Sequence, residues 1–357
     1  MQALILASTP VISAGIVNYR CSRETAKAVR SLLAQTRPPQ KIFVVDNCSG
    51  DDSVVYLRGE FAGQPQIEII ANEKNVGFGA AQNQCIRAMR SDYYLALNPD
   101  AMLREDYLEK LVAALESNPQ AGYATGLIYF SEEDGTPTLH IFSAGHWWLR
   151  GRTALNRFYL LDYPLARMHS GEVGGASGCA PLYRHAMLDA IDLGGGEYFD
   201  ETYFMYIEDI DLDWRAHICG WACWFDPQAV AYHAGEVTGG ARSGRIYAQI
   251  LTNRWLMILK NDRLGMLVRD LPYIIKNDLQ FFWPTLWRYG GMRYLFHDLL
   301  RRVREAWRKR RIVQRSARAS NSQLREWMEL SLRDIHKFNE WQKQNPTAVR
   351  PYERMKP

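Results

Sequence analysis

Hydrophobic runs alternate with amphipathic stretches along the first third of the chain. Four apolar runs have the length and composition of buried strands: residues 11–19, 41–46, 67–72 and 93–98. After the first run, Ala26, Val29 and Leu33 recur on one helical face, and a further helix is expected to continue to Met89. Strands separated by helices predict an α/β fold, Rossmann-like, with a mostly parallel central sheet flanked by helices and joined by right-handed crossovers.

Polar residues mark the predicted carboxyl ends of these strands. They are Tyr19, Asp46, Asn72 and Asn98. Ligands of such sheets bind outside the carboxyl ends of the strands. The sequence therefore predicts that a binding site forms along this edge.

The pattern changes twice further along the chain. From Tyr123 onward the segments become shorter and richer in glycine, and near residue 240 the pattern shifts to helix. We therefore expect a nucleotide-binding and catalytic domain over residues 1–240, followed by a helical, basic C-terminal extension over residues 241–357.

A cluster of acids lies in the aromatic segment 199–221. Glu208, Asp209, Asp211 and Asp213 begin an amphipathic helix that also carries Trp214. Acids in a first helical turn are stabilised by the helix macrodipole, so a capped structural helix is one interpretation. Buried carboxylates near a ligand site are the other, because burial of an acid needs a compensating reason.

Two further residues have the chemistry of a metal site. Asp100 follows Asn98-Pro99 at a strand end, where one carboxylate could hold Mg²⁺ or Mn²⁺ through a diphosphate. The alternative for Asp100 is a helix N-cap. His233, after a short apolar run, is either a further ligand or a structural histidine.

Two more segments suggest nucleotide contacts. Asp46 could bind a base or ribose, or could satisfy N–H groups of its own turn. The loop 75–79 opens a helix, where N–H groups can meet phosphate, but it lacks the spacing of a P-loop or a dinucleotide fingerprint.

Composition and charge limit the alternatives. The 47% hydrophobic content can build a large core, and the six cysteines have no framework or zinc spacing, which favours reduced thiols in the cytoplasm. A net charge of only +4 argues against nucleic acid as the partner of the whole chain. Residues 288–318 are strongly basic and follow an aromatic-rich segment, a combination that suits an anionic membrane surface. A solvated helical tail packed on the main domain is the alternative.

An ordered series of motifs extends these signals. The segments are VNYR (17–20), VVDNCSGDDS (44–53), NEKNVGFGAAQN (72–83), LALNPDA (95–101), ASGCAPLYR (176–184), FDETYFMYIEDIDLDWR (199–215) and AYHAG (231–235). The series resembles the family 2 glycosyltransferases with a GT-A fold, in particular their rhamnosyltransferase-like branch. The resemblance covers about the first 260 residues and leaves the basic segment out.

The resemblance implies an inverting transfer from a nucleoside-diphosphate sugar to an acceptor hydroxyl. On the family's pattern, Asp46 contacts the base, and the residues implied in nucleotide binding are Asn18, Tyr19, Arg20, Asp46, Asn75, Gly77 and Asn98. Asp100 takes the last place of an Asp-x-Asp metal motif whose first position is Asn98 here, and His233 completes the metal–diphosphate contact. Asp209 is the implied general base, with Glu208 as the alternative.

Departures from the family pattern shape the expected activity. Gln249 is separated from Arg254-Trp255 by four residues, unlike the Gln-x-x-Arg-Trp element of processive synthases, so a single addition is expected. The resemblance favours dTDP-L-rhamnose, with UDP- or GDP-sugars as alternatives, and a glycan or lipid-linked glycan acceptor at the cytoplasmic, inner face of the plasma membrane. A non-catalytic nucleotide- or glycan-binding protein is the rival from another class.

Overall fold

The computed structural model describes residues 9–132, 135–235, 243–295 and 299–344. Four parallel strands form one half of its sheet, in the order β3 (Ile67–Ala71), β2 (Lys41–Asp46), β1 (Ile12–Asn18) and β4 (Tyr93–Leu97). The helices between them are α1 (Ser22–Leu33), α2 (Ser53–Glu60) and α3 (Phe78–Ala88). The four predicted strands are thus confirmed, with each strand end within one residue of the expected position, whereas α2 was not predicted.

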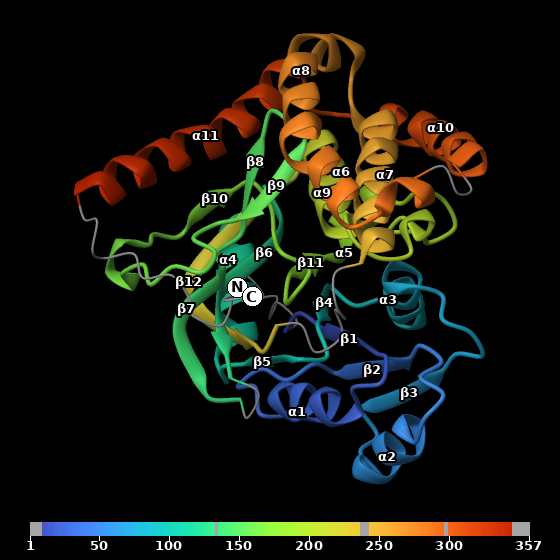
Figure 1. The fold of residues 1–357 in the computed structure, drawn as a ribbon. Coiled ribbons are helices and arrows are strands. Elements are labelled where there is room, and N and C mark those ends of the chain that lie inside the picture. The colour runs from blue at the N-terminus through green and yellow to red at the C-terminus, as the bar shows by residue number, and fades with distance from the viewer. Residues whose placement is uncertain (1–8, 133–134, 236–242, 296–298, 345–357) are drawn as a thin grey trace, which may run out of the picture.

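The other half of the sheet is mixed. β11 (Leu182–Arg184) is antiparallel to both β4 and β6 (Ala121–Ser131), and β12 (Ala222–His233) runs parallel to β6. The edges are completed by β5 (Ala101–Leu103), β7 (Pro137–Ser143) and β10 (Gly171–Val173). Helices α4 (Tyr107–Ser117), α5 (His185–Ile191) and α6 (Glu208–Ile218) cover this half (Figure 1).

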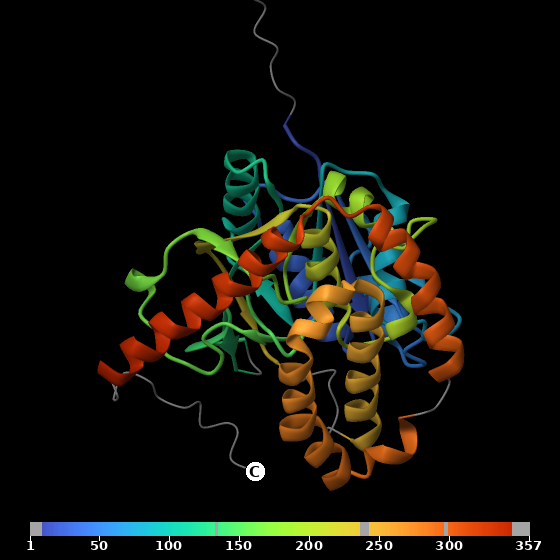
Figure 2. The same ribbon diagram turned by 90° about the horizontal axis from the view of Figure 1, so that it is seen from above.

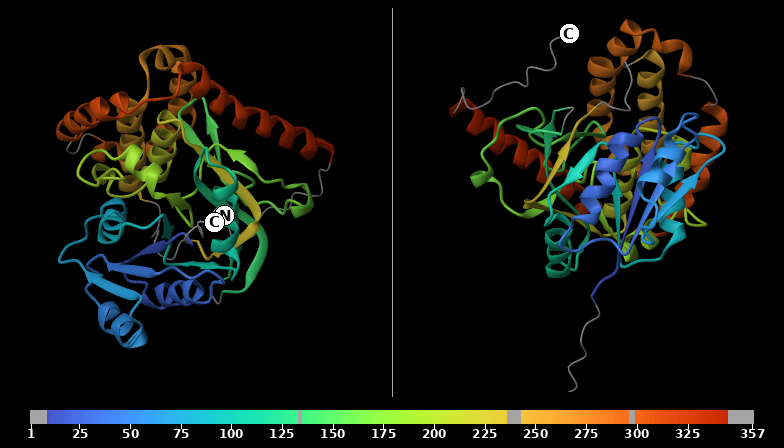
Figure 3. Two further views of the ribbon diagram at one scale, coloured as in Figure 1. Left: turned by 180° about the vertical axis from the view of Figure 1, so that it is seen from behind. Right: turned by 90° about the horizontal axis from the view of Figure 1, so that it is seen from below.

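The described residues after 243 are almost entirely helical. They form α7 (Gly244–Asn261), α8 (Leu264–Asn277), the π-helical turn η3 (Asp278–Phe282), α9 (Trp283–Arg288), the turn η4 (Gly291–Tyr294), α10 (Leu299–Arg315) and α11 (Asn321–Gln344). Helices α7, α8 and α9 make a lobe that projects from the sheet, and α11 runs outward (Figures 2 and 3). The expected boundary at residues 240–241 lies outside the described residues.

A shared core joins these helices to the sheet domain. Trp148, from the hairpin β8 (His146–Leu149) and β9 (Thr153–Asn156), packs on Trp214 of α6 and Trp327 of α11, with ring centroids 5.3 and 4.7 Å apart. All three rings are buried, together with Leu256 and Met257 of α7. Because each buried aromatic ring contributes a large apolar area, this cluster fixes the C-terminal helices against α6.

Strand β1 leaves no room for a side chain at Gly15. A Cβ atom there would lie 2.0 Å from the Tyr94 hydroxyl and 2.8 Å from the Cys85 Cβ. We expect Gly15→Ala to lower the free energy of unfolding by about 1–3 kcal/mol, since overpacking displaces well-packed neighbours. Gly59→Ala, in α2 with open space around it, is the matched control and should raise stability by up to about 1 kcal/mol. Urea unfolding measures both, and a neutral Gly15→Ala would contradict the close contact.

Candidate active site

A cleft of about 900 Å³ opens at the carboxyl ends of β1 and β4. Its walls come from the strand ends, the loop before α3, the loop before α6, and helices α7 and α10. Of the expected nucleotide-binding residues, the lining includes Tyr19, Asn75, Gly77 and Asn98. It also includes Arg245, which sequence analysis left unassigned, and Arg301 and Arg302, which sequence analysis assigned to a membrane surface or a solvated tail. Cations in a cleft of this kind suit a phosphate-bearing ligand.

Asp46 and Asn18 lie under the cleft and are buried. Asp46 Oδ1 accepts hydrogen bonds from Asn18 Nδ2 (2.7 Å) and the Ser49 hydroxyl (2.5 Å), and its Oδ2 accepts from the Ser49 N–H (3.1 Å). Ser49 also holds Arg20, whose φ is +58°, through the Arg20 N–H (2.9 Å). In this conformation Asp46 shapes its own turn, and a contact with a base remains a prediction.

The loop before α3 closes against the loop before α6. Asn75 Oδ1 accepts from Asn47 Nδ2 (2.9 Å) and from the Gly77 N–H (3.0 Å), and the Phe78 N–H donates to the Phe204 carbonyl (2.7 Å). Gly77 has a φ of +87°, and a Cβ there would lie 2.3 Å from the Phe204 oxygen. Only glycine combines this conformation with this approach.

Asp100 and His233 meet next to Asn98 and Pro99 of the cleft lining, although they are 133 residues apart. Asp100 precedes β5, His233 ends β12, and these two strands pair. Asp100 Oδ1 lies 3.0 Å from His233 Nε2, and Asn98 Nδ2 lies 3.4 Å from the same nitrogen. Because Asp100 leads into a strand, the helix-capping alternative is wrong.

These residues fit a divalent cation. His233 Nδ1 is buried without a hydrogen-bond partner, and one carboxylate faces the opposite ring nitrogen. No group of three or more His, Cys, Asp or Glu side chains suited to a metal occurs in the part of the chain that the structure describes. A donor set this small matches an ion that takes most of its ligands from a diphosphate and water.

Asp209 lies on the other side of the short segment 176–179. Its Oδ2 accepts from the Gly178 N–H (3.0 Å), while the next residue, Cys179, accepts at its carbonyl from the Asn98 N–H (2.8 Å). The candidate base and the Asn98–Asp100 turn thus flank the same backbone. A Cβ atom at Gly178 would be in ordinary van der Waals contact with Asp209 Cβ, at 3.4 Å, so the segment packs directly on this side chain.

Glu208 differs from its neighbour. Its Oε2 is buried and has no hydrogen-bond partner, and burial, together with the adjacent Asp209, raises the pKa of Glu208 to about 8. A carboxyl group with such a pKa is protonated at neutral pH. It can donate a hydrogen bond there, but it cannot accept a proton.

The two remaining acids of the cluster are structural. Asp211 accepts from Arg215 (2.8 Å) and Lys260 (2.9 Å). Asp213 Oδ2 lies 2.7 Å from His146 Nδ1, and its Oδ1 accepts from the Ala176 N–H (3.1 Å). Burial raises the pKa of Asp213 to about 6 despite His146. Asp211 and Asp213 are therefore held by these partners, and both positions face inward.

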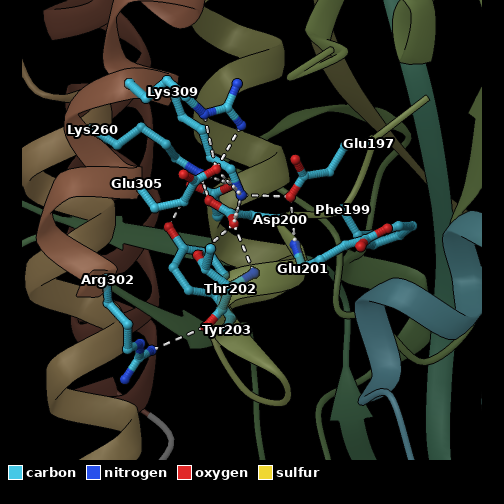
Figure 4. A network of polar contacts seen from close by, with 12 residues as sticks. Glu197, Phe199, Asp200, Glu201, Thr202, Tyr203, Lys260, Arg302, Glu305 and Lys309 are labelled. Carbon is cyan, nitrogen blue, oxygen red and sulfur yellow. Dashed lines mark hydrogen bonds and ion pairs between the residues drawn. The ribbon is translucent and has the colours of Figure 1, made fainter. Parts of the chain in front are cut away.

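A buried polar network ties the site to the C-terminal helices (Figure 4). Asp200 accepts from Lys260 of α7 and from Lys309 of α10 (2.6 Å), and Lys309 also donates to Glu197 (2.5 Å). Burial alone would raise the pKa of Asp200, but the two ammonium groups outweigh it and hold that pKa well below its usual range. Asp200 also accepts from the Thr202 N–H (3.0 Å), where the loop before α6 begins.

Two residues of α7 hold the rest of that loop. Phe204, Tyr206 and Ile207 all have positive φ, a conformation that costs energy for residues other than glycine. Asn253 Nδ2 donates to the carbonyls of residues 203, 205 and 206 at 2.9–3.1 Å, and Gln249 Nε2 donates to those of 203 and 205 at 3.0 Å. Sequence analysis missed this role, although polar side chains at i and i+4 on a largely apolar helix were a readable signal.

Comparisons with known proteins agree with this geometry. Residues 13–191 match the model of the family described as glycosyl transferase family 2. An N-acetylglucosaminyl-diphospho-decaprenol L-rhamnosyltransferase of Mycobacterium tuberculosis is 26% identical over 249 residues, which is 65% of this chain and 78% of that protein. A chondroitin synthase of Escherichia coli is 31% identical over 109 residues, 30% of this chain and 16% of that protein.

Solved structures show the same fold. GalNAc-T7, crystallised with UDP, GalNAc and Mn²⁺, aligns with a TM-score of 0.64 at 14% identity over 92% of this chain, which spans 58% of that chain. TarS 1–349 of S. aureus in complex with UDP-GlcNAc aligns with a TM-score of 0.53 at 16% identity, over 86% of this chain and 91% of that chain. The expected GT-A fold is thereby confirmed.

Removal of the Asp200 charge tests the network. Asp200→Asn leaves two buried ammonium groups without their shared partner, so we expect a loss of about 3–5 kcal/mol in the free energy of unfolding. Because the pKa of Asp200 is lowered, its contribution is present above about pH 4 and is lost as the pH falls through the folded-state pKa. Asp189→Asn, at the exposed pair with Arg90, is the control and should cost less than about 1 kcal/mol. Equal losses in urea unfolding would contradict the assigned importance of the network.

Proposed function

The chain belongs to glycosyl transferase family 2, and on that premise we propose that it transfers one sugar from a nucleoside-diphosphate donor to a hydroxyl group of a glycan or lipid-linked glycan acceptor, with inversion. The observation that carries the proposal is the segment 176–179, which has Asp209 on one side and the Asn98–Asp100 turn on the other. A donor whose diphosphate lies at the turn would thus present its anomeric carbon near Asp209. L-rhamnose from a dTDP donor is the proposed sugar, with support from the name of the mycobacterial relative.

Asp209 is the proposed general base. An acceptor hydroxyl is a poor nucleophile until its proton is removed, so a carboxylate has to accept that proton as the oxygen attacks the anomeric carbon. The Gly178 N–H donates to one oxygen of Asp209 and so fixes the position of the carboxylate beside the segment 176–179. Glu208 serves beside it as a protonated group that orients a hydroxyl.

The diphosphate end is the proposed place for Mg²⁺ or Mn²⁺, held by Asp100 and His233. When bound, such an ion neutralises charge on the leaving diphosphate. Tyr19, Asn75, Gly77 and Asn98 line the proposed nucleotide cleft, while Asn18, Arg20 and Asp46 shape the turn beneath the base. Arg245 and Arg301 add positive charge to the same walls.

The acceptor is proposed to reach the site at the inner face of the plasma membrane. The name of the mycobacterial relative specifies a polyprenyl diphosphate acceptor. In the described part of this chain, no helix is both long enough and apolar enough to cross a bilayer. A peripheral contact through the basic C-terminal segment is therefore the form of membrane association that we propose.

The base assignment has a direct kinetic test. Asp209→Asn should lower kcat by about 10²–10⁴-fold, the usual contribution of a general base, while nucleotide affinity is retained. Glu208→Gln should remain active, because the amide group of glutamine can donate a hydrogen bond in place of the protonated carboxyl group. If Glu208 were the base, kcat/KM of the unaltered enzyme would rise with pH through about 8 as its carboxyl group ionised, and Glu208→Gln would abolish that rise. Such a pH dependence of kcat/KM would assign the general base to Glu208 instead of Asp209.

Nucleotide and metal binding can be measured without knowledge of the acceptor. We expect dTDP and dTDP-rhamnose to raise Tm more in the presence of Mn²⁺ than with chelator, since a ligand that binds only the folded state stabilises it. Asp100→Ala and His233→Ala should remove the dependence on metal. Glu73→Ala, an exposed acid of the loop before α3, should preserve it. No shift with any nucleoside diphosphate would refute the transferase proposal, and a shift confined to UDP- or GDP-sugars would change the donor.

A further inference from the structure

An apolar stripe runs along the outer face of α8. It consists of Leu264, Val268, Leu271 and Ile275 and continues to Leu279 in η3, and the spacing of three or four residues places these side chains on one side of the helix. All five side chains are exposed, with fractions of 72% at Leu264, 63% at Val268 and 61% at Leu279. The opposite face, with Met266 and Ile274, is buried against the hairpin and α7 core. One side of the helix therefore packs on the protein core, and the other side exposes apolar side chains to solvent.

Aromatic side chains continue this surface beyond the helix. Phe281 in η3 is 64% exposed and Trp287 in α9 is 81% exposed, and Tyr289, which follows α9, is also exposed. A single exposed apolar residue is common, but a contiguous series over two helices marks an interaction surface. Tryptophan and tyrosine in particular are enriched where one side of a protein meets the headgroup layer of a membrane.

In this lobe the acidic side chains are buried or half-buried, and the exposed ionised side chains are basic. Between residues 264 and 295, all of which the structure describes, the two acids are Asp270 and Asp278. Asp270 is buried and accepts from Arg150 (2.6 Å) and Arg152 (2.9 Å). Asp278 is half-buried and accepts from Arg254 (2.5 Å). Both acids thus face the protein and are neutralised there.

The exposed ionised side chains of the same segment are all basic: Lys276, Arg288 and Arg293. Lys276 lies beside Leu271 and Ile275 of the stripe, while Arg288 and Arg293 follow in α9 and η4, so the lobe combines exposed apolar side chains with positive charge. This combination matches an anionic lipid surface, in which acyl chains take the apolar face and headgroups meet the cations. A second copy of the chain fits poorly, because a two-fold contact through this patch would bring the same cations together.

The basic helix α10 is less suited to this contact than its sequence suggested. Lys309 is buried between Asp200 and Glu197, Arg308 pairs with Glu305 (2.6 Å), and Arg310 donates to the carbonyls of Leu259 and Asp262. Much of its charge is thus committed to the protein itself. The three cations Lys276, Arg288 and Arg293 of the lobe are exposed instead.

We propose that the outer face of α8, η3 and α9 lies in the interfacial layer of an anionic membrane, with the α8 stripe embedded and Lys276, Arg288 and Arg293 at the headgroups. This inference deepens the peripheral contact of the proposed function and rests on it. It moves the contact from the basic helix α10 to the lobe in front of it. The segment 264–295 reaches the cleft at Tyr294, so a membrane-held lobe brings the cleft close to lipid-linked material.

Vesicle binding of the full chain tests the surface. Wild type should sediment with vesicles of phosphatidylcholine mixed with phosphatidylglycerol, and far less with phosphatidylcholine alone. Val268→Glu/Leu279→Glu should lower the partition coefficient at least about tenfold, because charge is placed in the embedded stripe. Val55→Glu/Leu139→Glu adds the same charge at exposed apolar sites in α2 and β7, at 76% and 72% exposure, and should bind like wild type.

A second variant keeps the test valid if the first folds poorly. Lys276→Gln/Arg288→Gln/Arg293→Gln should weaken binding on the order of a hundredfold in the anionic vesicles, from about 1 kcal/mol for each cation. The inference is overturned if wild type binds neither vesicle, or if the control pair weakens binding as much as the stripe pair. It is also overturned if the stripe pair converts a dimer to a monomer in sedimentation equilibrium but leaves vesicle binding unchanged.

The nucleotide experiment on the same preparation separates the two proposals. Vesicle binding that depends on the stripe, without a Tm shift by any nucleoside diphosphate, would refute the transferase proposal and leave the membrane surface in place. A metal-dependent Tm shift by a nucleotide, without vesicle binding, would refute the membrane surface and leave the transferase proposal in place. Neither readout needs the acceptor.

Discussion

Two buried carboxylates, Asp200 and Asp211, share the ammonium group of Lys260, and the arrangement of the site depends on this contact. Asp200 begins the loop before α6, Asp211 lies in the first turns of α6, and Lys260 is near the end of α7. Isolated charges at these positions would cost several kcal/mol each, so the carboxylates and the lysine can be buried only together. The contact therefore fixes the orientation of the C-terminal helices on the sheet domain.

The consequence for chemistry lies in the loop between the two carboxylates. Three of its residues have positive φ, and such strain persists only where the surroundings determine the backbone. Asn253 and Gln249 supply that constraint from α7 by binding the loop carbonyls. The loop in turn meets the Gly77 turn of the donor side and leads directly into Glu208 and Asp209. Helices outside the family match at residues 13–191 are thus part of what positions the proposed base.

The same helices have a second face. The inner sides of α7 and α8 are held by buried arginine–carboxylate pairs, whereas the outer side of α8 carries leucine, valine and isoleucine in contact with solvent. The two acids of this segment face arginines of the protein: Asp270 meets Arg150 and Arg152 of the sheet domain, and Asp278 meets Arg254 of α7. Because its inner side is held in this way, α8 could contact a membrane without displacing α7 or the loop before α6.

The sequence by itself determined the parallel half of the sheet and the edge at which the site forms. Apolar runs and helical spacing indicate burial from local sequence alone. The polar residue at each strand end is likewise a local feature, independent of the rest of the chain. For the same reason the turn at Asp100 and the acidic start of α6 could be recognised as candidates, although their roles remain predictions. Only the tertiary structure decided which carboxylates are structural. Asp211 and Asp213 look like Asp209 in the sequence, but Lys260 and His146 face the first two, from 49 and 67 residues away. The chemistry of a buried charge depends on its partners in space, and no local pattern contains those partners.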